Sequence, residues 1–151
     1  MLNIGEKAPL ISGLDQENNT VTLEQFLGNK VVLYFYPKDS TPGCTAEACN
    51  LRDNYELLIK QGYKVIGVSP DSVKSHEKFA AKFELPFPLI ADVDKKIVTD
   101  YQVWGEKKFM GRTYMGVFRT TFIIDEKGII EEIIEKVDTK NHTEQIINKT
   151  K

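Results

Sequence analysis

The two cysteines of the chain, Cys44 and Cys49, lie in one short stretch that is rich in proline and glycine at its start. The stretch follows an apolar run at residues 31–36, and from Cys44 onward apolar residues recur at helical spacing. We therefore expect Cys44 in the first turn of a helix, where backbone N–H groups lack intrahelical partners and the helix dipole is positive. Such a position favours the anionic form of a sulfur, so Cys44 is predicted to be a redox-active thiolate.

The spacing of the two cysteines predicts a change of shape during the reaction. Cys49 follows Cys44 by five positions on the same predicted helix, on the polar side that it shares with Arg52. On a regular helix this spacing places the Cα atoms ~8.5 Å apart, with side chains ~140° from each other. A disulfide needs Cα atoms less than about 7 Å apart. The two sulfurs could therefore join only if the helix between them unwinds, which predicts a folded reduced state and a locally unfolded oxidised state.

The remaining pattern predicts the scaffold that positions this stretch. We expect strands at 31–36, 64–68 and 86–91, a hairpin turn at 16–19, a helical turn at 23–27, helices at 44–62, after Ser72 and through Tyr101, a long surface loop at 103–117, a hairpin at 120–137 and a terminal helix at 142–149. Strands that alternate with helices and then form an antiparallel hairpin indicate an α/β fold. Its mixed central sheet would be flanked by helices, as in thioredoxin-like folds.

Length and charge exclude several classes of protein. The 151 residues suit a single domain over 1–151, and the formal charge of −2 comes from interspersed acidic and basic side chains. No basic stripe for nucleic acid is therefore expected. No apolar run approaches the ~20 residues of a membrane span, and the first residues do not resemble a secretion signal. Two cysteines are too few for a secreted disulfide framework, which predicts a cytoplasmic protein whose cysteine pair serves chemistry.

The motif around Cys44 resembles a known family. Pro37-x-x-x-Thr41-x-x-Cys44 is similar to the peroxidatic motif of peroxiredoxins. Within that family, Cys44-x-x-x-x-Cys49 together with residues 119–125 resembles the peroxiredoxin Q group, also called the bacterioferritin comigratory proteins. The resemblance continues through residues 68–72, 85–92 and 103–107, and so it covers nearly the whole chain.

The resemblance implies reduction of hydrogen peroxide and organic hydroperoxides without a metal or a bound organic cofactor. Cys44 would attack the peroxide and become a sulfenic acid, and Cys49 would resolve it as a disulfide. The reductant implied by the family is thioredoxin or a similar dithiol protein. Because an internal cysteine pair needs no partner subunit for resolution, a monomer is expected.

Three further residues are expected at the site. Thr41 precedes Cys44 by one loop turn, so its hydroxyl could accept from the peroxide and donate to the sulfur. Pro37, with the nearby second proline, would stiffen the loop and limit the access of water. Arg119, carried over by its position in the family motif, would supply a permanent positive charge to the thiolate and to the developing oxyanion.

Two other readings remain open from the sequence. One is a disulfide oxidoreductase of the thioredoxin type, although that class favours Cys-x-x-Cys over the spacing found here. The other is a redox-sensing or metal-binding regulatory module without turnover. His76 and His142 lie at no ligand-like spacing from the cysteines, so a zinc site is not expected.

Overall fold

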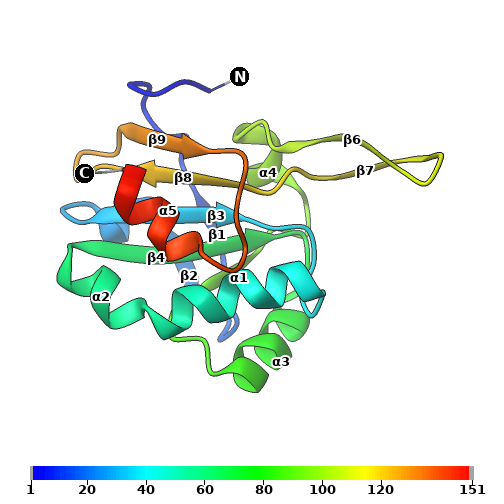
Figure 1. The fold of residues 1–151 in the computed structure, drawn as a ribbon, viewed down its shortest axis with the longest axis horizontal. Coiled ribbons are helices and arrows are strands. Elements are labelled where there is room, and N and C mark those ends of the chain that lie inside the picture. Colours follow the sequence, from blue (N-terminus) through cyan, green and yellow to red (C-terminus); the bar gives the residue numbers. More distant parts are fainter. Residues whose placement is uncertain (1, 150–151) are drawn as a thin grey trace.

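The computed structural model of the protein describes residues 2–149, in which a seven-stranded mixed sheet has the order β2-β1-β5-β4-β3-β8-β9 (Figure 1). Its strands are β1 Ser12–Leu14, β2 Thr20–Thr22, β3 Lys30–Phe35, β4 Tyr63–Ser69, β5 Leu89–Ala91, β8 Thr120–Ile124 and β9 Ile130–Ile134. The three central strands β3, β4 and β5 run parallel, and β8 pairs with β3 in the opposite direction. The predicted mixed α/β sheet is confirmed.

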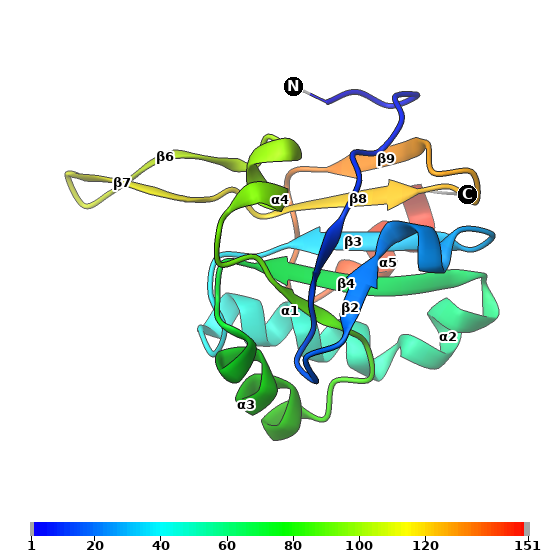
Figure 2. The same ribbon diagram turned by 180° about the vertical axis from the view of Figure 1, so that it is seen from behind.

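Helices cover both faces of this sheet (Figures 1 and 2). The helical elements are η1 Leu23–Phe26, α1 Pro42–Asp53, α2 Tyr55–Lys60, α3 Val73–Phe83, α4 Lys96–Asp100 and α5 His142–Lys149. Side chains of α1, α3 and α5 share one hydrophobic cluster, and those of η1 and α4 belong to the cluster on the other face. Strand β3 supplies both clusters, because its alternate residues Val32 and Leu33 point to opposite faces. This two-sided burial explains why residues 31–36 lack the alternation of a half-exposed strand.

The sheet brings distant segments to one edge. Phe35, at the end of β3, is paired with Val68 near the end of β4 and with Thr120 at the start of β8. The loop that follows β3 and the residue that precedes β8 are therefore neighbours in space. Helix α1 starts from this edge, which places Cys44 close to Arg119.

The helix predicted to run from Cys44 toward Gly62 is interrupted. Helix α1 begins at Pro42 and ends at Asp53, and α2 follows after Asn54. The Asn54 side-chain amide donates to the Asn50 carbonyl at 2.8 Å, so a side chain bonds to a carbonyl of the last turn of α1. The expected single helix was wrong at this point, although α2 does stop before Gly62, which has a φ of +88°.

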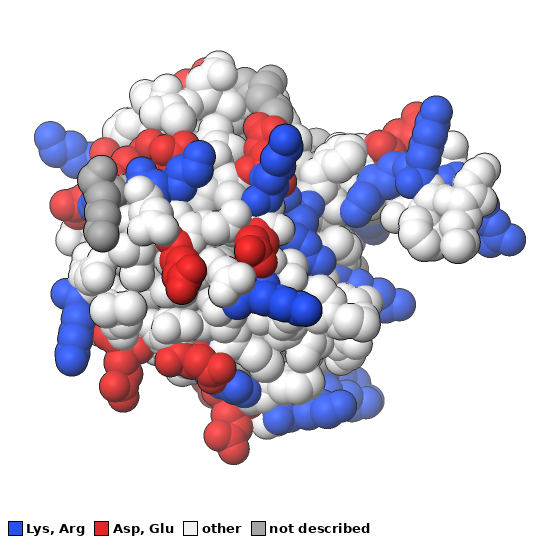
Figure 3. Space-filling model, in the orientation of Figure 1, with Lys and Arg blue, Asp and Glu red and all other residues white. Residues whose placement is uncertain are grey.

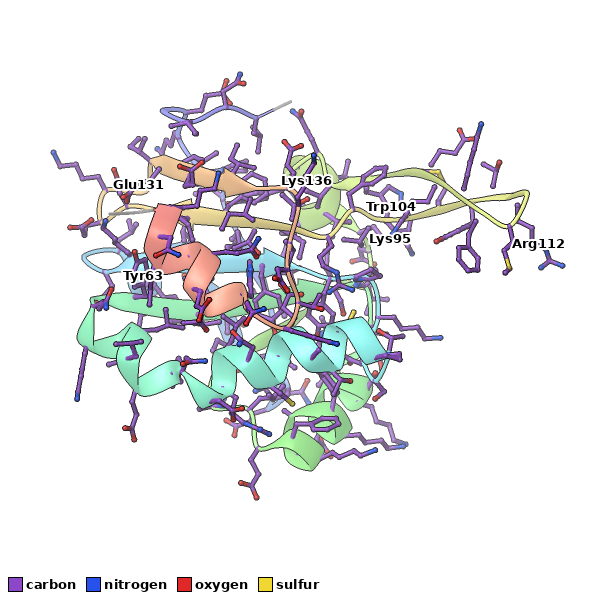
Figure 4. The ribbon with its side chains drawn as sticks, viewed as in Figure 1. Tyr63, Lys95, Trp104, Arg112, Glu131 and Lys136 are labelled. Carbon is purple, nitrogen blue, oxygen red and sulfur yellow. The ribbon has the colours of Figure 1, made fainter. Side chains whose placement is uncertain are left out.

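The long loop predicted at 103–117 was also wrong, because this segment forms a projecting hairpin of β6 Trp104–Phe109 and β7 Arg112–Val117. Its two-residue turn uses Met110 and Gly111, both with positive φ, as hairpin turns that match the twist of strands require. Figure 4 shows Trp104 at the base and Arg112 at the tip, with the Lys95 ammonium 5.5 Å from the Trp104 ring centre. In Figure 3 basic side chains gather on this hairpin, whereas both signs are mixed over the sheet-covering helices.

Candidate active site

Cys44 lies in the first turn of α1, as predicted. Thr41 is the N-cap, Pro42 is the first helical residue, and the first intrahelical bond runs from Thr45 N to Thr41 O at 2.9 Å. The amides of Gly43 and Cys44 thus precede the internal bonds of the helix. Only 1% of Cys44 is exposed, and its side chain belongs to the hydrophobic cluster that includes Tyr34. The helix terminus and the burial together place the sulfur in a site with little water.

Arg119 reaches this sulfur from the residue before β8. Its Nη2 donates to Cys44 Sγ at 3.3 Å, and its Nη1 donates to Glu47 Oε1 at 2.7 Å. Gly43 leaves room for this approach, because a Cβ at that position would lie 3.1 Å from Arg119 Nη2, a tight contact that would require the guanidinium to shift slightly. The guanidinium therefore places a permanent positive charge beside the predicted nucleophile.

Glu47 is a residue of the site that the sequence reasoning missed. It is fully buried, and this burial raises the pKa of its carboxyl to about 7 although Arg119 opposes the rise. Its Oε2 lies 3.5 Å from His142 Nε2 on α5, and within residues 2–149 that oxygen has no hydrogen-bond partner. The signal available in the sequence was the i, i+3 spacing between Cys44 and Glu47, which puts both on one side of a helix. An acidic residue is usually exposed, so this spacing alone does not predict burial.

Thr41 is the N-cap of the helix that carries Cys44, but its side chain is oriented differently from the expectation. Thr41 Oγ1 donates its hydrogen to Lys38 O at 2.9 Å, and so the predicted donation to the sulfur is not made in this structure. A hydroxyl that donates in this way can still accept a hydrogen bond. Pro37 is half-buried two residues after the end of β3, in the loop that leads to α1.

Asp39 anchors the loop between β3 and α1. Its carboxylate accepts from Tyr36 OH at 2.6 Å and from Ser75 Oγ at 2.8 Å, and lies 2.7 Å from His76 Nδ1. Its backbone N–H donates to Asp71 Oδ2 at 2.8 Å. In the part of the chain from 2 to 149, Asp39, Asp71 and His76 are the group whose ligand-type atoms lie within 4.8 Å of one another. Because these atoms already bond within the protein, the cluster acts as a fixed support for the loop.

Cys49 lies on the same unbroken helix as Cys44, and both thiols are free. Its side chain is partly exposed, whereas Cys44 is buried. The different environments of the two sulfurs agree with the sequence prediction. An intact α1 keeps the two residues farther apart than a disulfide permits.

Comparisons with known proteins agree with this geometry. The model of the AhpC/TSA family matches residues 4–133. The chain is 46% identical over 147 residues to the putative peroxiredoxin bcp of Haemophilus influenzae, covering 97% of this chain and 95% of that protein. It is 44% identical to peroxiredoxin Bcp of Escherichia coli, covering 97% and 94%.

Solved structures give the same result. Xanthomonas campestris peroxiredoxin Q matches with a TM-score of 0.85 and 36% identity, covering 91% of this chain and 87% of that one. A cysteine-to-serine mutant of Xylella fastidiosa PrxQ matches with a TM-score of 0.92 and 33% identity, covering 99% and 95%. The expected thioredoxin-like architecture is thus confirmed. A buried cysteine at a helix start, with an arginine beside its sulfur, is an arrangement suited to the chemistry of a thiol peroxidase. The chain belongs to the AhpC/TSA family, within its Bcp and PrxQ group of peroxiredoxins.

Proposed function

We propose that this chain reduces hydrogen peroxide and organic hydroperoxides through Cys44, and that thioredoxin or a similar dithiol protein returns the enzyme to its reduced state. The contact of Arg119 with the Cys44 sulfur at 3.3 Å carries the proposal. The thiolate attacks one peroxide oxygen, the S–O bond forms as the O–O bond breaks, and the leaving alkoxide or hydroxide takes up a proton. Cys44 becomes a sulfenic acid, and the peroxide is reduced to an alcohol or water.

The groups around the sulfur have separate roles in this step. Arg119 stabilises the thiolate and then the negative charge that develops on the leaving oxygen. Thr41, whose hydroxyl donates to the backbone, accepts a hydrogen bond from the incoming peroxide. Pro37 stiffens the loop that shapes the pocket. The unpaired amides of the first turn of α1 add donors directed at the same space.

The second half of the cycle follows from the position of Cys49. Cys49 attacks the sulfenic sulfur, a disulfide forms, and water leaves, after which a dithiol reductant exchanges with the disulfide. This step requires the start of α1 to unwind. The unwinding segment lies between two anchors: Asp39, which is bonded to α3, and Asn50, which is bonded to α5. The Asn50 side chain accepts from Thr143 N and donates to Lys140 O, both at 2.8 Å, and so holds the rest of α1 in place.

The proposal includes a single domain and a monomer in the cytoplasm. A sheet with a hydrophobic cluster on each face supports one folding unit. An internal cysteine pair supports resolution without a second subunit. Two free thiols suit a reducing compartment that also supplies dithiol reductants. Among residues 2–149, no helix is both long and apolar enough to cross a membrane.

Intact-protein mass spectrometry tests the cycle directly. After one equivalent of peroxide is added to the reduced protein, we expect a mass loss of two hydrogens without a covalent dimer. This is the result of an internal disulfide between the two cysteines of the chain. A mass gain of one oxygen that persists, or a disulfide-linked dimer, would contradict internal resolution.

Arg119→Ala is expected to lower the second-order rate of the peroxide step by about 10²-fold or more, the scale of losing one oxyanion donor. Stopped-flow kinetics with hydrogen peroxide measures this rate. Arg112→Ala, at the exposed hairpin tip, is the matched control and is expected to react at the wild-type rate. An unchanged rate in a folded Arg119→Ala protein would show that Arg119 does not take part in the peroxide step. Circular dichroism establishes the folding of each variant.

A further inference from the structure

Arg119 is one cation that faces two acids. It donates to the sulfur of Cys44 through Nη2 and to the carboxyl of Glu47 through Nη1. Glu47 is fully buried and Cys44 is 1% exposed, so water screens neither group. A single positive charge cannot compensate two negative charges in such a place, because an uncompensated ion is costly to remove from water. Two acids that share a buried site therefore resist simultaneous ionisation.

The imidazole of His142 does not supply a second positive charge. The amide orientation of Gln145 is fixed, because its Oε1 accepts from Asp138 N and its Nε2 donates to Lys136 O. His142 Nδ1 must then donate to Gln145 Oε1, at 2.9 Å, while Nε2 lies 2.8 Å from Thr121 Oγ1, a hydroxyl that can donate to it. Burial lowers the pKa of His142, so the imidazole is neutral near pH 7, and its Nε2 can then accept from the Thr121 hydroxyl.

The other titratable groups around Glu47 and Cys44 leave the balance unchanged. Tyr34 on β3 stays neutral, because burial raises the pKa of its phenol well above the usual value. Asp39 and Asp138 face Tyr34 and His142 respectively and add no positive charge. Lys107 on β6 is a further cation near Arg119 and Cys44, but its side chain is partly exposed and its ammonium donates to Val117 O at 2.9 Å, so water screens this charge.

The second oxygen of Glu47 has room for a proton. Oε2 lies 3.5 Å from His142 Nε2, but Nε2 of the neutral imidazole carries no hydrogen, so no N–H of this ring reaches Oε2. This oxygen has no hydrogen-bond partner in the described chain, and neither does the hydroxyl of Tyr34. An unpaired anionic oxygen is far more costly to bury than a neutral carboxyl group, which favours the protonated form.

We propose that Cys44 and Glu47 hold one negative charge between them, with Glu47 protonated while Cys44 is a thiolate, and that Glu47 ionises when Cys44 is oxidised. The inference rests on the peroxidase function proposed above. The balanced step is Cys44–S⁻ + ROOH + Glu47–COOH → Cys44–SOH + ROH + Glu47–COO⁻. The sulfur loses two electrons to the peroxide, and the proton of Glu47 neutralises the leaving alkoxide. Arg119 is paired with one anion before the step and with one anion after it.

This exchange of charge makes Glu47 a positioning residue. Its protonation state decides which anion is paired with Arg119, and its proton neutralises the leaving alkoxide. In the reduced enzyme the neutral carboxyl leaves the charge of Arg119 available to the thiolate. In the sulfenic acid form the Glu47 carboxylate forms the ion pair with Arg119, so the site does not retain an unpaired buried cation. The net charge of the three groups is zero in both states.

Difference infrared spectroscopy of the Cys49→Ser protein tests this exchange, because the sulfenic acid persists without the second thiol. On addition of one equivalent of hydrogen peroxide, we expect the C=O band of a protonated carboxylic acid to disappear and carboxylate bands to appear. The lost band is expected to shift in D₂O, to be absent from Cys49→Ser/Glu47→Gln, and to remain in Cys49→Ser/Glu56→Gln, where the altered residue is exposed on α2.

A second variant keeps the test independent of oxidation and of the folding of the Glu47→Gln protein. Cys44→Ala removes the competing anion, so Glu47 is expected to ionise at lower pH than in the reduced Cys49→Ser protein. A dimedone adduct of Cys44 in the oxidised sample separates the two proposals. If the adduct forms while the carboxyl band stays unchanged, the shared charge is overturned and the peroxidase function stands; if no adduct forms, both fail. Equal Glu47 titration with and without the Cys44 thiol also overturns the shared charge.

Discussion

Cys44→Ser is expected to abolish peroxide consumption completely. The serine hydroxyl is a far weaker acid than a thiol, so neither the helix terminus nor Arg119 can keep it as an anion near neutral pH. The sulfur is also the atom that accepts oxygen, and serine cannot form the corresponding sulfenic acid. The measurement is peroxide-dependent oxidation of NADPH through thioredoxin reductase and thioredoxin, with disappearance of peroxide followed in parallel.

The same assay separates the proposed peroxidase from the two alternatives considered from the sequence. A redox sensor would oxidise once and show no turnover, and a disulfide oxidoreductase would reduce a disulfide substrate without peroxide. Residual peroxide consumption by a folded Cys44→Ser protein would identify Cys49 as a nucleophile, since the chain has no other cysteine. A melting curve compared with the wild type establishes that the variant is folded.

Cys49→Ser is expected to consume one equivalent of peroxide and then stop. The first step needs only Cys44 and the groups around it, and none of the contacts of Arg119 with the site involves Cys49. Without the second thiol the sulfenic acid has no internal partner, so it accumulates and is trapped by dimedone. Stopped-flow and steady-state measurements on the same sample separate the intact first step from the lost turnover.

The matched control for this experiment is Cys49→Ala. If loss of turnover comes from the missing thiol, serine and alanine at this position give the same result, because neither can attack a sulfenic acid. Full turnover with thioredoxin in either variant would show that Cys49 is not required for resolution. The catalytic cycle would then not require α1 to unwind.

The predictions that succeeded depended on neighbours along the chain. The strand at 31–36, the helix start at Cys44 and the terminal helix at 142–149 all follow from residue spacing and from proline and glycine positions. The two wrong predictions were also local, and both missed a conformation set by one or two residues. Asn54 interrupts the helix with its side chain, and the turn at Met110 and Gly111 converts an expected loop into a hairpin.

The active site was predictable in its residue types and only partly in its contacts. Proximity of Cys44 and Arg119, which are 75 positions apart, was expected from the family resemblance and is supported by the pairing of β3 with β8. The orientation of Thr41 toward the Lys38 carbonyl was not predicted, because a hydroxyl beside several acceptors chooses among them only in the folded loop. The burial of Glu47 was missed altogether.

The sequence by itself predicted Cys44 as the nucleophile and Cys49 as its resolving partner, because a helix start and a five-residue spacing are properties of a short segment. Only the tertiary structure decided which charges surround that sulfur. Glu47 lies 72 positions before Arg119, and His142 comes from the last helix, so their meeting depends on how α1 and α5 pack over the sheet. The interaction of a buried charge with its neighbours depends on all the elements that exclude water from it. That property is not local to any stretch of the chain.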